Sequence, residues 1–265
     1  MTDDCPLDDY GVLQIGGADA RRFLQGQLSN DLQRLEPARP LRAGLHNPQG
    51  RVLALLRLWP ASAGDTDVLA LLPAELLSAV ATQLRRYVLR ARVTIEDASD
   101  RWRAWGLRRS DGSPEVRLAP RDAAPVPDGT PLGREAWEAL EIAAGLPEVR
   151  AATAGEFVAQ MLNLDCIEAI AWDKGCYTGQ EIIARAHYRG QMKRRMRRFA
   201  AALADPPAPG ATHTTSDGVE LRVVRAARVA AGRCELLGVA PLERPSHDEL
   251  PLPYAWPAGR AAGGA

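Results

Sequence analysis

The chain has 265 residues, of which 46% are hydrophobic, and its 33 basic and 33 acidic residues give a formal net charge of zero. This length can bury a sizeable core and divide into two or three small domains. The balanced charge excludes a global field that would draw the chain to nucleic acid or to a membrane. The acidic N-terminus does not resemble a signal peptide, and the apolar run Val52–Trp59 is too short to cross a bilayer. We therefore expect a soluble cytoplasmic protein with no membrane partner.

The first half of the chain predicts mainly strands. Residues 12–15 alternate like a strand, and Asp19 can begin a helix that runs past Phe23. The turn sequence Asn47–Gly50 predicts a hairpin between strands 41–46 and 51–59. Apolar spacing predicts a helix after Pro73, and the remaining expected strands cover 68–72, 92–96, 102–107 and 115–118. Strands around one helix favour a small split β-α-β layer.

The second half predicts a linker, three helices and a β-rich end. Residues 119–133 are rich in Pro, Asp and Gly and read as a linker, and a helix is predicted over 134–144, ended by Gly145. Thr153 and Glu156 have the spacing of a capping box, which predicts a second helix through Phe157 and Met161. Short strands are expected at 169–172, 196–202, 219–229 and 235–240, and a disordered tail at 259–265.

The octapeptide Lys174–Glu181 is the most informative segment of the sequence. Thr178 and Glu181 again have capping-box spacing, and the helix that they predict can end at Gly190. Cys176 would then lie two residues outside a helix N-terminus. The positive end of the helix dipole and the nearby ammonium of Lys174 both favour a thiolate there.

Lysine and cysteine usage supports a chemical role for this octapeptide. The chain has only two lysines, Lys174 and Lys193, against 31 arginines, although so small a number is also compatible with chance. None of its four cysteines forms a C-x-x-C pair, and no Cys/His cluster has zinc spacing, so no resident metal is expected. The predicted catalytic residues are Cys176, as a nucleophile or transient thiolate ligand, and Lys174, as the point charge that holds its charge state.

The octapeptide resembles the signature K-G-C-[FY]-x-G-Q-E of the YgfZ family of folate-binding proteins, relatives of the glycine cleavage T-protein and of mitochondrial iron–sulfur maturation factors. The match extends through Ala184-Arg185 and Arg189-Gly190 to Lys193–Arg195. Weaker pieces occur in the family's order and span nearly the whole chain: Gly17–Ala20, Phe23–Gln27, Pro48–Arg51, Ala144–Pro147 and Leu252–Tyr254.

The resemblance implies an α+β fold with three domains in a ring like that of the T-protein. Residues 1–42 and 134–192 would form a discontinuous folate-binding domain, 43–133 a ferredoxin-like domain and 193–258 a C-terminal β-barrel. A central channel would hold tetrahydrofolate as the cofactor. The matching cofactor-binding residues are the aromatic side chains of Tyr10 and Trp137, together with Tyr177 and Arg185. Without the resemblance, Trp137 would be interpreted as helix core.

Two departures from the T-protein pattern bear on catalysis. Relatives of the T-protein carry a glutamate directly before the A-G turn, where this chain has Ala143. They also carry an acidic residue on the strand after the hairpin turn, where this chain has Ala54 and Leu55. General acid–base catalysis needs a positioned titratable side chain, so the sequence leaves open whether the protein is an enzyme.

The resemblance implies a tetrahydrofolate-binding protein that assists iron–sulfur cluster assembly or repair in client proteins and thereby supports tRNA modification indirectly. One alternative is a folate-dependent one-carbon transferase of the aminomethyl type. Another is an RNA-binding protein that uses the run Ile182–Phe199, which holds seven Arg or Lys residues and no acid. Such a run is also typical of an ordinary solvated surface.

Overall fold

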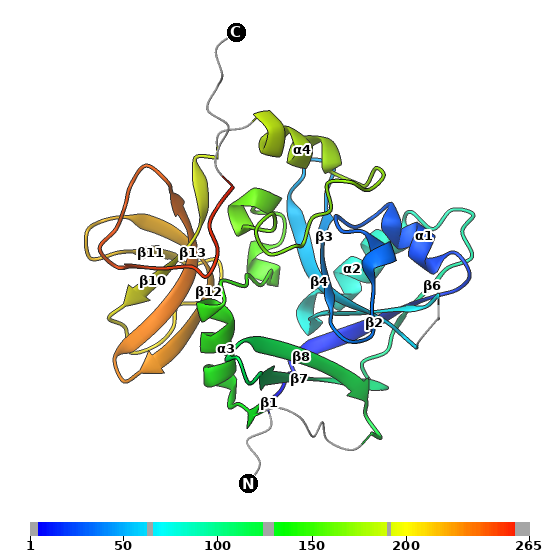
Figure 1. Ribbon diagram of the computed structural model, residues 1–265, viewed down its shortest axis with the longest axis horizontal. Helices are drawn as coiled ribbons and strands as arrows, with labels where there is room; N and C mark the ends of the chain where they lie inside the picture. Colours follow the sequence, from blue (N-terminus) through cyan, green and yellow to red (C-terminus); the bar gives the residue numbers. More distant parts are fainter. Residues whose placement is uncertain (1–4, 63–65, 124–129, 190–191, 258–265) are drawn as a thin grey trace.

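Three antiparallel sheets form the frame of the protein (Figure 1). The computed structural model describes residues 5–62, 66–123, 130–189 and 192–257. Three predicted features lie outside the described residues, wholly or in part. They are the tail 259–265, the helix end at Gly190, and residues 124–129 of the 119–133 linker. None of the described helices is both long enough and apolar enough to span a bilayer.

The first sheet has five strands and separates two apolar clusters. Its order is β3 (Leu41–His46), β4 (Val52–Pro60), β5 (Val68–Pro73), β2 (Tyr10–Gly16) and β6 (Thr94–Asp97). Successive side chains of a strand point to opposite faces. Leu13 and Ile15 of β2 therefore enter the largest core, with α1 (Ala20–Gln25) and α2 (Leu77–Arg85), whereas Tyr10 and Val12 enter a second cluster.

The hairpin predicted around Asn47–Gly50 is confirmed by the pairing of β3 with β4, and the helix predicted after Pro73 is confirmed as a 3-10 turn, Ala74–Leu76, followed by α2. The strand β2 pairs with both β5 and β6. The sheet therefore crosses the predicted domain boundary between residues 42 and 43, which falls inside β3. The division into three domains stays a prediction.

The second sheet lies against α3 (Arg134–Ala143), the helix predicted over 134–144. Its strands are β1 (Cys5–Pro6), β7 (Trp102–Arg108), β8 (Pro114–Pro120) and β9 (Thr130–Pro131). Gly106 of β7 lets the indole of Trp137 pack on the strand, because a Cβ there would lie 2.4 Å from the ring. On its other side, α3 packs against the third sheet (Figure 1).

The third sheet is open, so the predicted closed β-barrel is not found in the described residues. Its order is β11 (Thr212–Thr214), β12 (Glu220–Ala230), β13 (Arg233–Pro241), β10 (Arg194–Ala201) and β14 (Glu249–Leu250). The edge strands β11 and β14 have only three and two residues and do not pair with each other. The mixture of helices and antiparallel sheets agrees with the α+β class.

The helix predicted from Thr153 through Met161 is wrong. The segment contains two 3-10 turns, Ala151–Thr153 and Ala159–Leu162. The Thr153 hydroxyl bonds the backbone of Arg150 instead of capping a following helix, and Gly155 has a left-handed φ of 76°. Gly155 and Phe157 then exchange backbone hydrogen bonds with Val52, so tertiary pairing with the sheet overrides the local capping signal. The short strand expected at 169–172 is likewise not formed.

Candidate functional site

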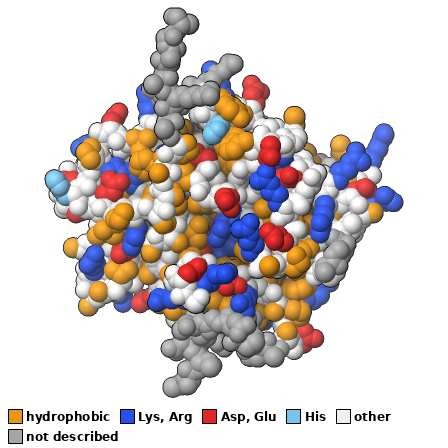
Figure 2. Space-filling model, in the orientation of Figure 1, with side chains coloured by type: hydrophobic (Ala, Val, Ile, Leu, Met, Phe, Trp, Pro, Cys, Tyr) orange, Lys and Arg blue, Asp and Glu red, His pale blue; other side chains and the backbone are white. Residues whose placement is uncertain are grey.

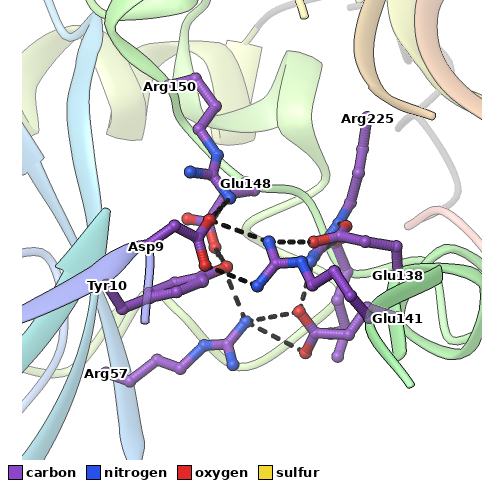
Figure 3. Close-up of polar contacts among 10 residues, drawn as sticks. Asp9, Tyr10, Arg57, Glu138, Glu141, Glu148, Arg150 and Arg225 are labelled. Atoms are coloured by element: carbon purple, nitrogen blue, oxygen red, sulfur yellow. Dashed lines mark hydrogen bonds and ion pairs between the residues drawn. The ribbon is translucent and has the colours of Figure 1, made fainter. Parts of the chain in front are cut away.

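Charged side chains converge where β4, α3 and β12 meet, and Figure 3 shows them pointing toward one another from these elements. Figure 2 shows Lys, Arg, Asp and Glu side chains gathered in the middle of the same face of the molecule. We call this cluster the arginine–carboxylate centre. It comprises Asp9, Tyr10, Arg57, Glu138, Glu141, Glu148, Arg150 and Arg225.

Glu141 is the anion at the heart of the centre, and its side chain is only 1% exposed. Its carboxylate accepts two hydrogen bonds from Nη2 of Arg57, at 3.0 and 2.7 Å, and one from Nη1 of Arg225 at 2.6 Å. Burial alone would raise the pKa of Glu141, but the charges of Arg57 and Arg225 outweigh it and lower the pKa to about 2. A single buried carboxylate thus neutralises parts of two buried guanidinium groups.

Tyr10 and Glu148 form the second half of the centre. The Tyr10 hydroxyl donates a hydrogen bond to Oε2 of Glu148, and the guanidinium carbons of Arg150, Arg134 and Arg57 lie 5.3, 5.8 and 5.9 Å from the centroid of the Tyr10 ring. Burial raises the pKa of Glu148, although Arg57 lies 3.8 Å from its carboxylate and opposes the shift. The sequence-based conclusion that the usual proton-handling groups are absent is therefore incomplete, because Glu141 and Glu148 supply carboxyl groups from other positions.

Three buried N–H groups around the centre have no hydrogen-bond acceptor among the described residues. They are Nη1 of Arg57, Nη2 of Arg225 and Nε1 of Trp137. A buried donor without an acceptor is costly, and such groups in a folded protein call for an explanation. Arg225 also lines a pocket of about 440 Å³ beside the centre, together with Asp9, Glu148 and Arg150. The donor set fits a ligand that carries several carbonyl or carboxylate oxygens.

The structure brings two of the predicted cofactor-binding residues together. Tyr10 and Trp137 belong to the same apolar cluster, and Trp137 is fully buried on the inner side of α3, one turn before Glu141. The other candidates, Cys176, Lys174, Tyr177 and Arg185, lie away from this cluster, in the octapeptide and on α4 (Gln180–Arg189).

Lys174 anchors the octapeptide to the end of α1 and to the segment that follows it. Its ammonium donates hydrogen bonds to three backbone carbonyls, those of Gln25 at 2.8 Å, Leu28 at 2.6 Å and Asn30 at 2.8 Å. Burial lowers the pKa of Lys174 to about 8. The lysine therefore has a specific role, but the contacts that define it are with backbone oxygens. Three rotatable donors on one point charge suit this role better than a planar guanidinium does.

The turn at Cys176–Gly179 differs from the predicted capping box. Gly179 has a left-handed φ of 81°, so α4 begins only at Gln180. The side-chain bond at the start of the helix is made by Gln180, whose Oε1 accepts from the backbone N–H of Tyr177 at 3.3 Å. Cys176 is exposed in this turn. Its thiol is thus accessible, but it lies four residues before the first residue of α4, farther from the helix N-terminus than the predicted two.

His46 lies buried beneath this turn, and sequence reasoning did not single it out. Its ring stands edge-on to Tyr177, with 6.2 Å between centroids, and neither of its ring nitrogens has a hydrogen-bond partner among the described residues. A Cβ on Gly44 would lie 2.4 Å from the His46 ring, so that glycine makes room for the imidazole. Burial lowers the pKa of His46 to about 4.

We expect His46 to make stability fall on mild acidification. An unfolded histidine titrates near its ordinary pKa, so between about pH 6.5 and 4 the unfolded state binds the extra proton and the folded state does not. The contribution is complete above this window and is lost as the pH falls, by about 3 kcal/mol in total. Denaturant unfolding of wild type and His46→Phe at a series of pH values measures it. Parallel pH profiles for the two proteins would contradict the prediction.

The basic run after Ile182 does not form one free cationic surface. Arg195 pairs with Asp165 at 2.8 Å, and Arg197 and Arg198 form ion pairs with Glu249 and Glu235 respectively. These arginines stabilise the third sheet and its junction with residues 160–166. Arg185, Lys193 and Arg194 remain exposed. Among the described residues, no group of three or more His, Cys, Asp or Glu is arranged to hold a metal ion.

Of the residues of the centre, only the neutral Tyr10 was identified from the sequence, and the charged residues were not. Two signals pointed to them. Arg57 interrupts an otherwise apolar strand, and Glu141 follows Trp137 by four residues, which places both on one face of a helix. A charge in a buried pattern needs a partner, so such residues are candidates for a buried pair.

No model of a protein family matches the chain. An uncharacterized protein of Haemophilus influenzae is 30% identical over 210 residues, which cover 74% of this chain and 72% of the relative. The tRNA-modifying protein YgfZ of Klebsiella pneumoniae is 30% identical over 243 residues, with 77% of this chain and 73% of the relative covered.

Among solved structures, the glycine cleavage system aminomethyltransferase T of Bartonella henselae matches with a TM-score of 0.65. The match covers 91% of this chain and 78% of that one at 13% identity, so it shows a shared fold. The sequence relatives go further, because the chain covers more than two thirds of their length at 30% identity. The chain therefore belongs to the family of the tRNA-modifying protein YgfZ.

Proposed function

We propose that this protein binds tetrahydrofolate at the arginine–carboxylate centre and assists the assembly or repair of iron–sulfur clusters in cytoplasmic client proteins, through which it supports tRNA modification. Membership of the YgfZ family supports the link to tRNA modification. The shared fold with an aminomethyltransferase supports a folate ligand.

The observation that carries the folate part is the set of unpartnered donors at the centre. Arg57, Arg225 and Trp137 each hold a buried N–H group without an acceptor among the described residues. A pterin ring, an amide and carboxylates offer the oxygen and nitrogen acceptors that these groups lack. Arg57 and Arg225 would hold the ligand through charge-assisted hydrogen bonds, and Glu148 would keep or release a proton at its carboxyl oxygen. When bound, tetrahydrofolate would supply one-carbon carrier chemistry.

Cys176 carries the second part of the proposal. Its thiol is exposed at a turn that Lys174 and Gly179 hold in place, so a partner protein can reach it. We assign it the role of a nucleophile or transient thiolate ligand during cluster handling. Tyr177 and Arg185, which lie in the same region, remain candidates for contact with tetrahydrofolate.

A folate-dependent one-carbon transferase is the second candidate function. The specific observation in its favour is Glu148, a buried carboxyl group with a raised pKa that is hydrogen-bonded to Tyr10. A carboxyl group whose pKa is raised by burial suits general acid–base catalysis better than one that is firmly ionised. Transfer of the one-carbon unit of an aminomethyl donor to tetrahydrofolate, which gives methylene-tetrahydrofolate and releases the amine, would favour this function over the first if it is lost in Glu148→Gln.

Titration of the purified protein with tetrahydrofolate, followed by tryptophan fluorescence and by calorimetry, tests the ligand directly. Saturable binding with one site per chain is expected. The absence of any binding would refute the folate part of the proposal.

Trp137→Phe is expected to weaken tetrahydrofolate binding several-fold. Phenylalanine keeps most of the buried ring but lacks the Nε1–H group, whose hydrogen bond to a ligand acceptor is worth about 0.5–1.5 kcal/mol. Calorimetric Kd values measure the change. Trp102→Phe is the matched control, since Trp102 packs against the same cluster and should leave the Kd unchanged. If both variants bind like the wild type, the ligand lies elsewhere.

A further inference from the structure

Nitrogen-bearing side chains form a row on one face of the first sheet, the face from which Arg57 reaches Glu141. Arg42 of β3 is the direct cross-strand partner of Arg57 of β4. Arg42 and His46 share one face of β3, because they are separated by an even number of positions, with Gly44 between them. The row therefore leads from the arginine–carboxylate centre, through Arg42, to the imidazole beneath the octapeptide.

Arg42 differs from the other arginines nearby because its guanidinium forms no hydrogen bond or ion pair within the described part of the chain. Arg34 pairs with Asp173 at 2.9 Å, and Arg39 pairs with Glu36 at 3.3 Å. Arg109, on the facing hairpin, lies 3.6 Å from Glu115. Arg42 instead faces the like charge of Arg57 directly across the strands, an arrangement that is destabilising by itself.

A cleft of about 1050 Å³ opens beside Arg42. Residues of three segments line it: Asn30 to Arg42, Arg109 to Val116, and Asp165 to Trp172. Most acids in its wall are already paired, Glu36 with Arg39, Glu115 with Arg117 and Asp165 with Arg195, and Asp111 accepts from Ser113. Glu168 is the exposed acid whose charge acts on Arg42. Ile167, Ile170 and Trp172 supply apolar wall between the charges.

The electrostatics at Arg42 agree with this geometry. Burial, and then the charge of Arg57, lowers the pKa of Arg42 to about 10. The charges of Glu141 and Glu168 oppose this shift only in part, and neither carboxylate forms an ion pair with Arg42 among the described residues. A guanidinium in this state is stabilised by an added anion. The cleft thus offers a cation that lacks its anion, in a space larger than a single carboxylate needs.

We propose that the Arg42 cleft is a carboxylate-binding subsite that takes the γ-linked glutamyl tail of the folate bound at the arginine–carboxylate centre. The proposal rests on the proposed function, since the ring system of the same ligand must lie at the centre. Arg42 forms a bidentate pair with a tail carboxylate. The apolar wall contacts the methylene groups between successive carboxylates. The ligand class is therefore polyglutamylated tetrahydrofolate in preference to the monoglutamate.

Binding of tetrahydrofolate monoglutamate and triglutamate, at one fixed salt concentration, tests the subsite. For the wild type we expect the triglutamate to bind about tenfold more tightly, the effect of one charge-assisted hydrogen bond. Arg42→Gln should abolish this preference and leave the monoglutamate Kd within about twofold. Arg42→Lys should retain part of it, and Arg39→Gln, which removes a paired arginine of the same cleft, should retain all of it.

Each outcome decides between explanations. Equal Kd values for the two folates in the wild type, or a preference that survives Arg42→Gln, would overturn the subsite while leaving the proposed function intact. Failure of both folates to bind would overturn the proposed function and the subsite together. Free γ-triglutamate that binds through Arg42 as tightly as the folate triglutamate would assign the cleft to a separate oligocarboxylate and overturn the folate tail. Circular dichroism of Arg42→Gln and Arg42→Lys checks that both variants are folded.

Discussion

Glu141→Gln is expected to lower the free energy of unfolding by about 3–5 kcal/mol, the usual cost of removing one partner from a buried ion pair. Glutamine has nearly the same shape, so the cost comes from the lost charge and not from a cavity. Arg57 and Arg225, whose side chains are 6% and 4% exposed, would face each other without the anion between them. Guanidinium chloride unfolding at neutral pH measures the loss.

The control for this experiment lies on the same helix. Glu135 is 66% exposed, and its carboxylate lies 3.9 Å from Arg228, at the limit of an ion pair. Because such an exposed pair contributes little, Glu135→Gln should change stability by no more than about 0.5 kcal/mol. The pH dependence gives a second check. The pKa of Glu141 is lowered to about 2, so its contribution is complete above the unfolded value near 4.5 and is lost as the pH falls toward 2. Glu141→Gln should lack this acid limb, and a variant as stable as the wild type would show that Glu141 does not hold the centre together.

Local signals in the sequence predicted the elements better than the contacts between them. The β3–β4 hairpin, α2 and α3 follow from turn chemistry and apolar spacing, which act within a few residues. The capping signal at Thr153 failed because its neighbours pair with β4, about a hundred residues earlier in the chain. Long-range pairing of this kind leaves no mark in a short sequence window. For the same reason, the spacing of the strands after residue 193 does not show whether the edge strands pair with each other, and the expected closed barrel proved to be an open sheet in the described residues.

The candidate site divides in the same way. The octapeptide could be identified from the sequence because Lys174, Cys176 and Gly179 are close together in the chain. The arginine–carboxylate centre draws Arg57, Glu141 and Arg225 from three separate elements, and only the fold brings them together. This chain has Ala143 where relatives of the T-protein carry a glutamate, and Glu141, two positions earlier on α3, is the buried carboxylate of the centre. A sequence comparison position by position therefore misses the carboxylate that the fold places there.

Cys176→Ser is expected to abolish the cellular function while leaving the fold and folate binding unchanged. The side chain is exposed, so the substitution should alter stability by no more than about 0.5 kcal/mol. A serine hydroxyl does not ionise near neutral pH and therefore cannot replace a thiolate as nucleophile or metal ligand. In cells that carry only this variant, the activity of iron–sulfur enzymes and the modification of tRNA should fall to the level of cells without the protein.

Cys166→Ser is the matched control, because burial raises the pKa of the Cys166 thiol to about 12 and makes it a poor thiolate. Cells with this variant should behave like the wild type. Alkylation by iodoacetamide, read by mass spectrometry in a Cys5→Ser background, should label Cys176 before Cys166 or the buried Cys234. If Cys176→Ser restores enzyme activity and tRNA modification fully, sulfur chemistry has no part in the function. The octapeptide would then serve only to hold α4 and the His46 region in place, through Lys174 and Gly179, and the folate site alone would carry the activity.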